Sequence, residues 1–447
     1  MYIQQLSLAI LAMVIFFSFI DYKKTVLLWL PAQLLFNAQV AVRYEAPAMS
    51  LQIAVNIFLL GYYYLKCNIV GSKKEINRKE FPFWKVSIFI LLSYILSSIV
   101  SPYGTFRGFT SAIKYFVTDI GSVFLAFKMI ESDKDVRFFI KSCFLVFLLI
   151  VSLGISEFIL KDNLWADFVY IGSPHDETTE GRMFYVPPFL GGGHEMRYGM
   201  IRAISTFGIH IAFGVSCVVY FWLFLVMKVR KFSYISSMET TIMIVLLLIG
   251  VFLCNSKTGM VGLVFILLSV FPIGQLLKPR YIFPFLIGIS LLLIVFPEYL
   301  LNFVSLFNTD VAAEGGGSSV SARQQQLDVA MRMFFNNPVF GNGIGSIDVL
   351  KEIGDNSDIL GAESVWMQIL PERGLFGMLA HCYLYIAYYK YLSKRMPHRM
   401  LLIFLLTIIV MSTATGEITQ SYWGVVLIAV GKMFDKHIMG VTQTNYN

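Results

Sequence analysis

The chain has 447 residues, a mean hydropathy of +0.70 and only 14% charged residues. Soluble domains carry about 25% charged residues, so the composition excludes a soluble protein and indicates an integral membrane protein. The formal charge of +7 does not indicate binding to nucleic acid. The basic residues instead gather in short stretches beside apolar segments, where they suit a surface of anionic lipid.

Apolar segments long enough to cross ~30 Å of hydrocarbon recur along the chain. Peptide groups in lipid must be hydrogen-bonded within the segment, and these segments are far longer than barrel strands, so we expect helices. The sequence predicts one domain over residues 1–447, an all-α integral-membrane polytopic bundle of about 12–13 transmembrane helices. The predicted spans are 3–20, 25–42, 49–65, 86–100, 112–130, 138–160, 207–227, 240–254, 258–276, 281–296, 361–389, 400–412 and 421–434.

Lysine and arginine are distributed unevenly between the connections. Most of the 35 lie in alternate connections, which the positive-inside rule makes cytoplasmic. The rule places two large polar loops, 161–207 and 297–360, on the outer side, with the N-terminus outside and the C-terminus inside. The cytoplasmic connections are too short for a nucleotide-binding unit, which needs about 30 residues. Any substrate is therefore handled within the membrane or on its outer side.

The loop at 161–207 has the composition of an anion-binding segment. It contains a glycine-rich stretch and three arginines, Arg182, Arg197 and Arg202. Flexible backbone N–H groups and forked guanidinium groups both donate to phosphate oxygens. Arg202 is the strongest candidate because it shortly precedes the span that opens at about Phe207. An ordinary solvated loop is the alternative interpretation for all three arginines, and it is weakest for Arg202.

The loop at 297–360 is predicted to contain a short amphipathic helix that begins near Arg323, with a serine before it as N-cap. Its apolar stripe follows the i, i+3, i+4, i+7 spacing and consists of Leu327, Ala330, Met331 and Phe334. Arg323 falls within this stripe. An arginine on a buried face is costly unless an anion meets it, so Arg323 is predicted to bind an anion. Lys257, in the short outer connection after 240–254, either points to the same outer vestibule or snorkels to the interface.

The run from Asn336 to Gly345 ends this helix and predicts a compact turn. The next helix is predicted to begin at 358–362, with Glu363 in its first turn and a kink at Pro371. A carboxylate on a glycine-lined helix face at the membrane boundary is a candidate functional group, with helix capping as the alternative.

Three stretches together resemble the O-antigen polymerase/ligase superfamily, the Wzy and WaaL type of integral-membrane glycosyltransferase with a GT-C-like helical fold. They are RAISTF from Arg202, the segment from Ser321 through NPVFGNGIG, and the segment from Glu363 through ERGLFG. The resemblance implies a multi-pass protein of the bacterial inner membrane with its site facing the periplasm. It implies an undecaprenyl-diphosphate-linked oligosaccharide as substrate, surrounding membrane lipid, and a chain-length regulator protein as a partner.

Within this superfamily the resemblance favours a polymerase. Ligases carry a histidine where this chain has Glu363-Ser364, whereas polymerases vary at that place. Arg202 and Arg323 correspond to the paired loop arginines of the family. Ser256-Lys257 replaces a Ser-Arg pair, and a lysine can still bind phosphate, although not in a bidentate manner.

The chemistry of the reaction leads to the same residues. Breaking a sugar–diphosphate bond requires stabilisation of the departing charge by a metal or by fixed cations. The outer loops carry no DxD motif and no His/Asp cluster with metal-ligand spacing, so we predict a metal-independent, inverting reaction without a cofactor. Arg202 and Arg323 then stabilise the diphosphate, and Glu363 is the base for the attacking hydroxyl. Arg197 and Lys257 complete the predicted diphosphate-binding set.

Three alternatives remain at this point. A ligase of the same fold would transfer glycan to lipid A-core. A flippase or oligosaccharide transporter would perform no chemistry, but transporters often contain inverted repeats with binding groups near the midplane. This chain has no evident repeat, and its polar groups gather in asymmetric outer loops. A membrane protein with a different role is the third alternative.

Overall fold

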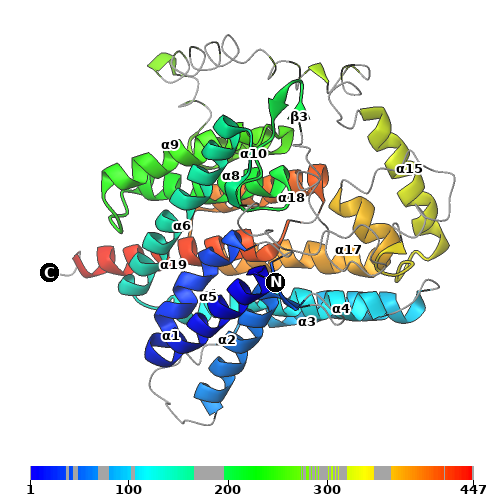
Figure 1. The fold of residues 1–447 in the computed structure, drawn as a ribbon, viewed down its shortest axis with the longest axis horizontal. Helices are drawn as coiled ribbons and strands as arrows, with labels where there is room; N and C mark the ends of the chain where they lie inside the picture. Colours follow the sequence, from blue (N-terminus) through cyan, green and yellow to red (C-terminus); the bar gives the residue numbers. More distant parts are fainter. Residues whose placement is uncertain are drawn as a thin grey trace.

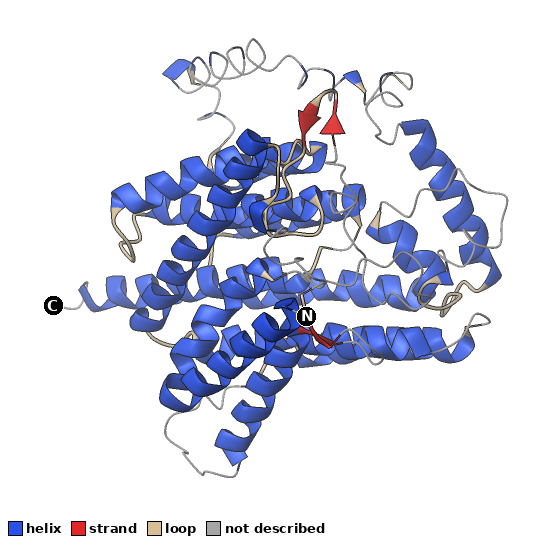
Figure 2. Cartoon of the chain, viewed as in Figure 1, coloured by secondary structure: helices blue, strands red, loops and turns tan. Residues whose placement is uncertain are grey.

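The computed structural model is almost entirely helical, which confirms the all-α membrane fold (Figures 1 and 2). The structure describes residues 2–36, 40–43, 49–68, 80–101, 106–165, 196–272, 320–346, 364–416 and 418–444, with scattered positions between 274 and 311. The strands among them form two short antiparallel pairs, β1 (Ala41–Arg43) with β2 (Met49–Ser50) and β3 (Met196–Arg197) with β4 (Met200–Ile201).

The described helices follow the predicted spans closely. They are α1 (Tyr2–Ala32), a 3-10 turn (Gln33–Leu35), α2 (Leu51–Asn68), α3 (Trp84–Val100), α4 (Phe106–Tyr115), a π-helical turn (Phe116–Ile120), α5 (Gly121–Met129), α6 (Asp133–Leu160), α8 (His210–Arg230), α9 (Ser237–Leu253), α10 (Lys257–Val270), α15 (Val320–Asn336), α17 (Val365–Leu392), α18 (His398–Thr415) and α19 (Gln420–Thr444). The first predicted span and the start of the second are joined in α1, which is broken at Asp21 (φ −145°, ψ 86°). The predicted end of the second span at 42 is wrong, because the helical part ends at Leu35 and Ala41–Arg43 form β1. Most of the predicted span at 281–296 lies outside the described residues.

Four described segments are long and apolar enough to cross a membrane, judged by length and composition. They are Gln4–Leu35, Asp133–Leu160, His210–Arg230 and His398–Thr415. Three further apolar helices, α3, α9 and α10, are shorter than these. Multi-pass character is therefore shown within the described part of the chain, whereas the total of 12–13 spans stays a prediction.

Helix α8 forms the centre of the core. Every residue from Phe213 to Met227 is buried, as expected for a helix that is apolar on all sides. α9, α10 and α19 pack around it. The Trp222 ring stacks on Phe404 of α18, with 4.0 Å between centroids, and its Nε1 donates to Ser269 of α10 at 3.1 Å.

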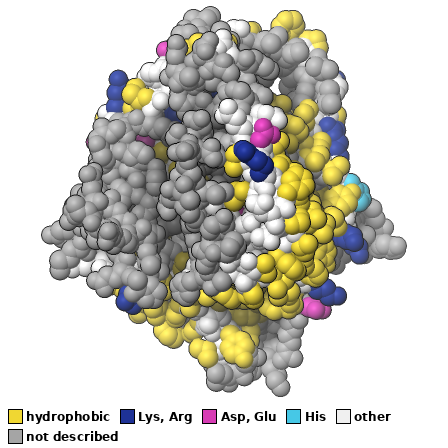
Figure 3. Space-filling view, turned by 90° about the vertical axis from the view of Figure 1, so that its right-hand side faces the viewer, with side chains coloured by type: hydrophobic (Ala, Val, Ile, Leu, Met, Phe, Trp, Pro, Cys, Tyr) yellow, Lys and Arg dark blue, Asp and Glu magenta, His cyan; other side chains and the backbone are white. Residues whose placement is uncertain are grey.

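The outer helices expose large apolar side chains. Phe16 and Phe19 of α1, Leu145 of α6 and Leu379 of α17 are all exposed, and Figure 3 shows hydrophobic side chains running down one flank of the molecule. Apolar patches of this extent belong against lipid rather than water. The bundle therefore has the surface of a membrane protein as well as its helix content.

Residues predicted to share the cytoplasmic side contact one another. Lys23 pairs with Glu131 at 3.1 Å and with Asp135 at 2.9 Å. Arg395, after α17, pairs with Asp435 of α19 at 2.9 Å. These pairs join connections that are far apart in the sequence. Connections that the charge pattern assigns to the cytoplasmic side are therefore in contact with one another in the structure.

Candidate functional site

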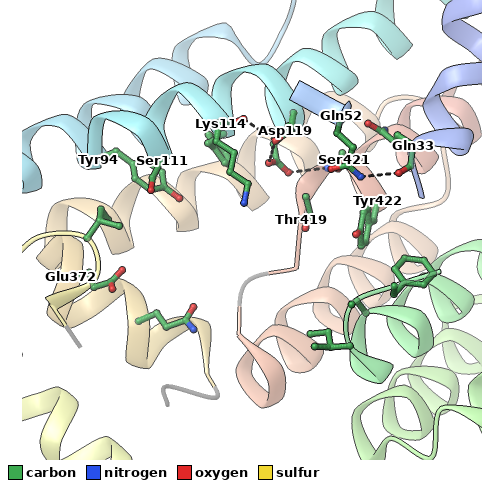
Figure 4. Close-up of a pocket in the computed structure, with 18 of the residues that line it drawn as sticks. Gln33, Gln52, Tyr94, Ser111, Lys114, Asp119, Glu372, Thr419, Ser421 and Tyr422 are labelled. Atoms are coloured by element: carbon green, nitrogen blue, oxygen red, sulfur yellow. Dashed lines mark hydrogen bonds between the residues drawn. The ribbon is translucent and has the colours of Figure 1, made fainter. Parts of the chain in front are cut away.

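A polar cavity of about 490 Å³ lies where α3, α4, the π-helical turn, α17 and α19 meet. Gln33, Gln52, Lys114, Gln368 and Thr419 contribute to its wall. Each comes from a helix end or connection that the charge pattern assigns to the outer side. Figure 4 shows Lys114 and Asp119 on one side of the cavity and Glu372 on the other. The cavity therefore lies at the end of the bundle that the charge pattern assigns to the outer side.

The π-helical turn holds Asp119 in place. The backbone N–H of Ser421 donates to Asp119 Oδ1 at 3.1 Å, and the Thr118 hydroxyl donates to Oδ2 at 3.0 Å. Single π-turns within helices often occur at functional sites. Here the turn interrupts a buried helix and directs a carboxylate toward the start of α19.

Beside it, a buried hydrogen-bond chain fixes Tyr115. Its hydroxyl donates to Gln420 Oε1 at 2.7 Å, and Gln420 Nε2 donates to the Tyr388 hydroxyl at 2.7 Å. Tyr388 stacks on Phe83 at 4.2 Å. Because satisfied buried networks are rigid, this part of the wall is held in one arrangement.

Two stretches that carry the family resemblance pack directly on each other. The turn at 338–343 pairs with the kinked segment 371–376 of α17 through four backbone hydrogen bonds of 2.8–3.1 Å. Asn342 strengthens this pairing, because its Nδ2 donates to the carbonyls of Met333 at 2.8 Å and Pro371 at 3.0 Å. We call this paired unit the interlock. The compact turn predicted from the sequence is confirmed.

Glycine is required where the two backbones of the interlock approach. Gly341 has φ +76°, and a Cβ there would lie 2.3 Å from the carbonyl carbon of Glu372. Gly374 has φ +61°, and its Cβ would lie 2.5 Å from the carbonyl oxygen of Val339. The break in α17 occurs at Gly374 (ψ −163°), shortly after Pro371, where the sequence predicts the kink.

The interlock sets Glu372 and Arg373 against the cavity. Glu372 Oε1 accepts from the backbone N–H of Gly345 at 2.8 Å, and its carbonyl accepts from the Ser97 hydroxyl. Arg373 is only 3% exposed, and its guanidinium lies 4.3 Å from the centroid of the Tyr94 ring. The cavity therefore presents a carboxylate and a guanidinium from consecutive residues.

Arg197 and Arg202 both belong to the small β3–β4 hairpin and its exit toward α8. Each is 7% exposed, so neither is a solvated loop residue. The segment that follows is fixed by Glu157 of α6, whose Oε2 accepts from the backbone N–H groups of Ile204 at 3.0 Å and Ser205 at 2.7 Å. A buried glutamate within a predicted span thus holds the arginine segment in place.

The hairpin exit brings Arg202 beside the start of α10. The backbone N–H of Ala203, the next residue, donates to the carbonyl of Leu253 at the end of α9 at 3.0 Å. Lys257 is the first residue of α10, directly after its N-cap Ser256. Two predicted cations from separate loops therefore occupy neighbouring segments.

Arg323 is half-buried and lies on the packed side of α15, as predicted. The buried residues on that side differ in part from the predicted apolar stripe. Gln326, Ala330 and Met333 are buried there, whereas Leu327 is 38% exposed. The predicted membership of Leu327 in the buried face is wrong, because α15 packs along an i, i+4, i+7 row from Gln326. Arg323 Nη2 donates to the carbonyl of Ala414 at the end of α18, at 3.3 Å.

The predicted site and the cavity adjoin but do not coincide. Arg197, Arg202, Lys257 and Arg323 are absent from the cavity wall. Glu363 lies outside the described residues, and α17 begins at Val365, later than the predicted start at 358–362. Among the described residues, no three His, Cys, Asp or Glu side chains form a group that could hold a metal ion.

The sequence analysis missed the charged residues of the wall. Lys114, Asp119, Glu372 and Arg373 all line the cavity. The sequence does indicate one pair, because Lys114 and Asp119 are charged residues within the largely apolar span 112–130. Nothing in the local sequence indicates that 114–119 faces 372–373, because the two stretches meet only through the packing of α3 against α17.

Residues 242–382 match the family model described as O-Antigen ligase. Over these residues the chain is similar to the O-antigen polymerase/ligase superfamily. No match was found among curated proteins. The matched segment runs from α9 into α17, and it contains Lys257, Arg323 and the whole interlock. The predicted resemblance is therefore confirmed at the level of the superfamily.

Proposed function

We propose that the chain transfers glycan from undecaprenyl diphosphate to the end of another lipid-linked repeat unit, as a polysaccharide polymerase of the bacterial inner membrane acting on the periplasmic side. The observation that supports this proposal is the cavity lined by Glu372 and Arg373 of the interlock, within the structure of a multi-pass helical bundle. The chain-length regulator remains a prediction for a partner.

The proposed step is a single displacement. A hydroxyl oxygen of the acceptor attacks the anomeric carbon, and the bond from that carbon to the diphosphate oxygen breaks, with its electron pair leaving on the diphosphate. Arg202 and Arg323, with Arg197 and Lys257, stabilise the growing negative charge. Glu363 takes the hydroxyl proton. One displacement inverts the anomeric centre.

The test uses the full chain in lipid nanodiscs with lipid-diphosphate repeat units extracted from cells that lack this chain. We expect a ladder of products that grows by whole repeat units. Unchanged substrate after prolonged incubation, with protein that is folded and monodisperse, would contradict the proposal. Transport without chemistry would give that result.

A ligase is the second candidate, because the matched family model carries that description. Adding lipid A-core to the same assay separates the two functions. A polymerase lengthens the lipid-linked chains whether or not lipid A-core is present. A ligase instead yields a single transfer onto lipid A-core and no ladder in its absence.

We also expect the reaction to proceed without a metal ion. Because the proposed cations are side chains, treatment with excess EDTA should leave the rate of ladder formation unchanged within about twofold. Removal of a catalytic metal ion would typically lower the rate far more. The measurement is the initial rate before and after chelation. A loss that Mg²⁺ or Mn²⁺ restores would show that a metal supplies the missing charge.

A further inference from the structure

The cavity wall combines three kinds of side chain. Aromatic rings come from Tyr94, Tyr115 and Tyr422, and amides come from Gln52 and Gln368. Aromatic faces suit the C–H face of a sugar ring. Amides offer both donors and acceptors, as sugar hydroxyls do. This mixture of an apolar wall with a few fixed polar groups is the usual character of a small-molecule site.

The carboxylates of the wall argue against a phosphate in the cavity. Asp119 and Glu372 lie on opposite sides of it (Figure 4). Carboxylates accept hydrogen bonds and cannot donate them when ionised, whereas a diphosphate offers only acceptors and negative charge. Sugar hydroxyls can donate to both carboxylates. Lys114 and Arg373 balance the two negative charges, so the cavity is not strongly basic.

Several of these groups are already oriented. Asp119 is held by Ser421 and Thr118, and Glu372 by the backbone of Gly345. Groups fixed before a ligand arrives lose little freedom on binding. The volume of about 490 Å³ lies within the range of roughly 300–1,000 Å³ that is typical of ligand sites. It suits a few sugar rings.

We infer that this cavity binds the pyranose rings of the glycan, while the diphosphate lies outside it at the segments of Arg202, Lys257 and Arg323. The inference rests on the proposed function, because it takes the glycan to be that of the lipid-linked repeat unit. Donor and acceptor glycans share this chemistry. The cavity therefore supplies sugar recognition, separate from the stabilisation of the leaving group.

The test measures binding without the reaction. The probe is the repeat-unit oligosaccharide released from its lipid by mild acid and freed of phosphate, titrated calorimetrically into the full chain in nanodiscs. The wild type should bind it, and Gln368→Leu and Glu372→Gln should each raise Kd about tenfold, the effect of one lost hydrogen bond to a ligand. Gln325→Leu and Asp328→Asn are matched controls, because both residues are exposed on α15. They should leave Kd unchanged.

Competition separates a sugar site from an anion site. Inorganic pyrophosphate and undecaprenyl phosphate should not displace the free oligosaccharide. Displacement by either one, absence of binding to folded wild-type protein, or equal Kd values in the cavity variants would each overturn the inference. If the wild type binds the oligosaccharide but forms no ladder from lipid-linked units, the proposed function fails while the sugar site stands.

Discussion

Replacement of Arg323 by alanine is expected to reduce ladder formation by roughly 100-fold or more, because losing one fixed donor to a developing negative charge typically costs 10²–10³ in rate. Arg323 lies on the packed side of α15 and reaches the end of α18. Its removal should lower kcat more than it raises KM for the lipid-linked substrate. The measurement is the initial rate of chain extension in nanodiscs.

Arg332 provides the matched control on the same helix. It is exposed, so Arg332→Ala removes an equal charge without touching the buried side of α15 and should retain nearly full activity. Arg323→Lys should recover part of the rate, since a lysine keeps the charge but not the forked geometry. Equal activity of Arg323→Ala and Arg332→Ala would remove Arg323 from the site.

Arg202→Ala should have an effect of similar size. If both arginines stabilise one diphosphate, the double variant should lose much less than the product of the two single losses, because groups that act as a unit are not additive. A fully multiplicative loss would mean that Arg202 and Arg323 act on separate steps or separate ligands. Thermal unfolding of each variant checks that the fold is retained.

The second large effect is on stability. Gly341→Ala should destabilise the protein by an amount on the order of 2–4 kcal/mol, since it combines a positive φ with backbone overlap. Its Cβ would meet the carbonyl carbon of Glu372 at 2.3 Å and the backbone nitrogen of Arg373 at 2.4 Å. Neither atom belongs to a flexible side chain. We expect a clear fall in Tm, with loss of activity because Glu372 and Arg373 would be displaced.

Gly61→Ala is the control for this substitution. Gly61 lies within α2, and a Cβ there would meet no atom within 4 Å. Alanine is the better helix former, so this variant should be at least as stable as the wild type. A Tm for Gly341→Ala equal to that of Gly61→Ala would show that the two backbones of the interlock can separate at little cost.

The fold could be predicted from the sequence because a chain that crosses hydrocarbon must satisfy its backbone hydrogen bonds within long apolar helices. Apolar length and the placement of lysine and arginine gave helix positions that the structure reproduces, and Lys23 contacts Glu131 as the predicted side assignment requires. Helix ends were harder, since hydropathy does not specify caps. The start of α17 at Val365 differs from the predicted 358–362 for this reason.

The candidate site could be predicted only in part. Arg202 and Arg323 could be singled out because a charge beside a membrane helix or on an apolar stripe is costly unless an anion or a hydrogen-bond acceptor meets it. The role of Glu157 could not be inferred, since its partners are backbone N–H groups of Ile204 and Ser205, which no side-chain pattern encodes. The opposed positions of Asp119 and Glu372 depend on long-range helix packing.

The interlock also bears on how such chains can be recombined. Residues 338–343 and 371–376 form one hydrogen-bonded unit across a long stretch of intervening chain, and their backbones approach closely at Gly341 and Gly374. Chimeras built from two relatives should therefore stay assembled when the whole block from 337 to 376 is exchanged together. Exchanging either half alone would pair two backbones from different parents, and we expect such chimeras to be less stable. This result should not depend on the glycan specificity of the parents.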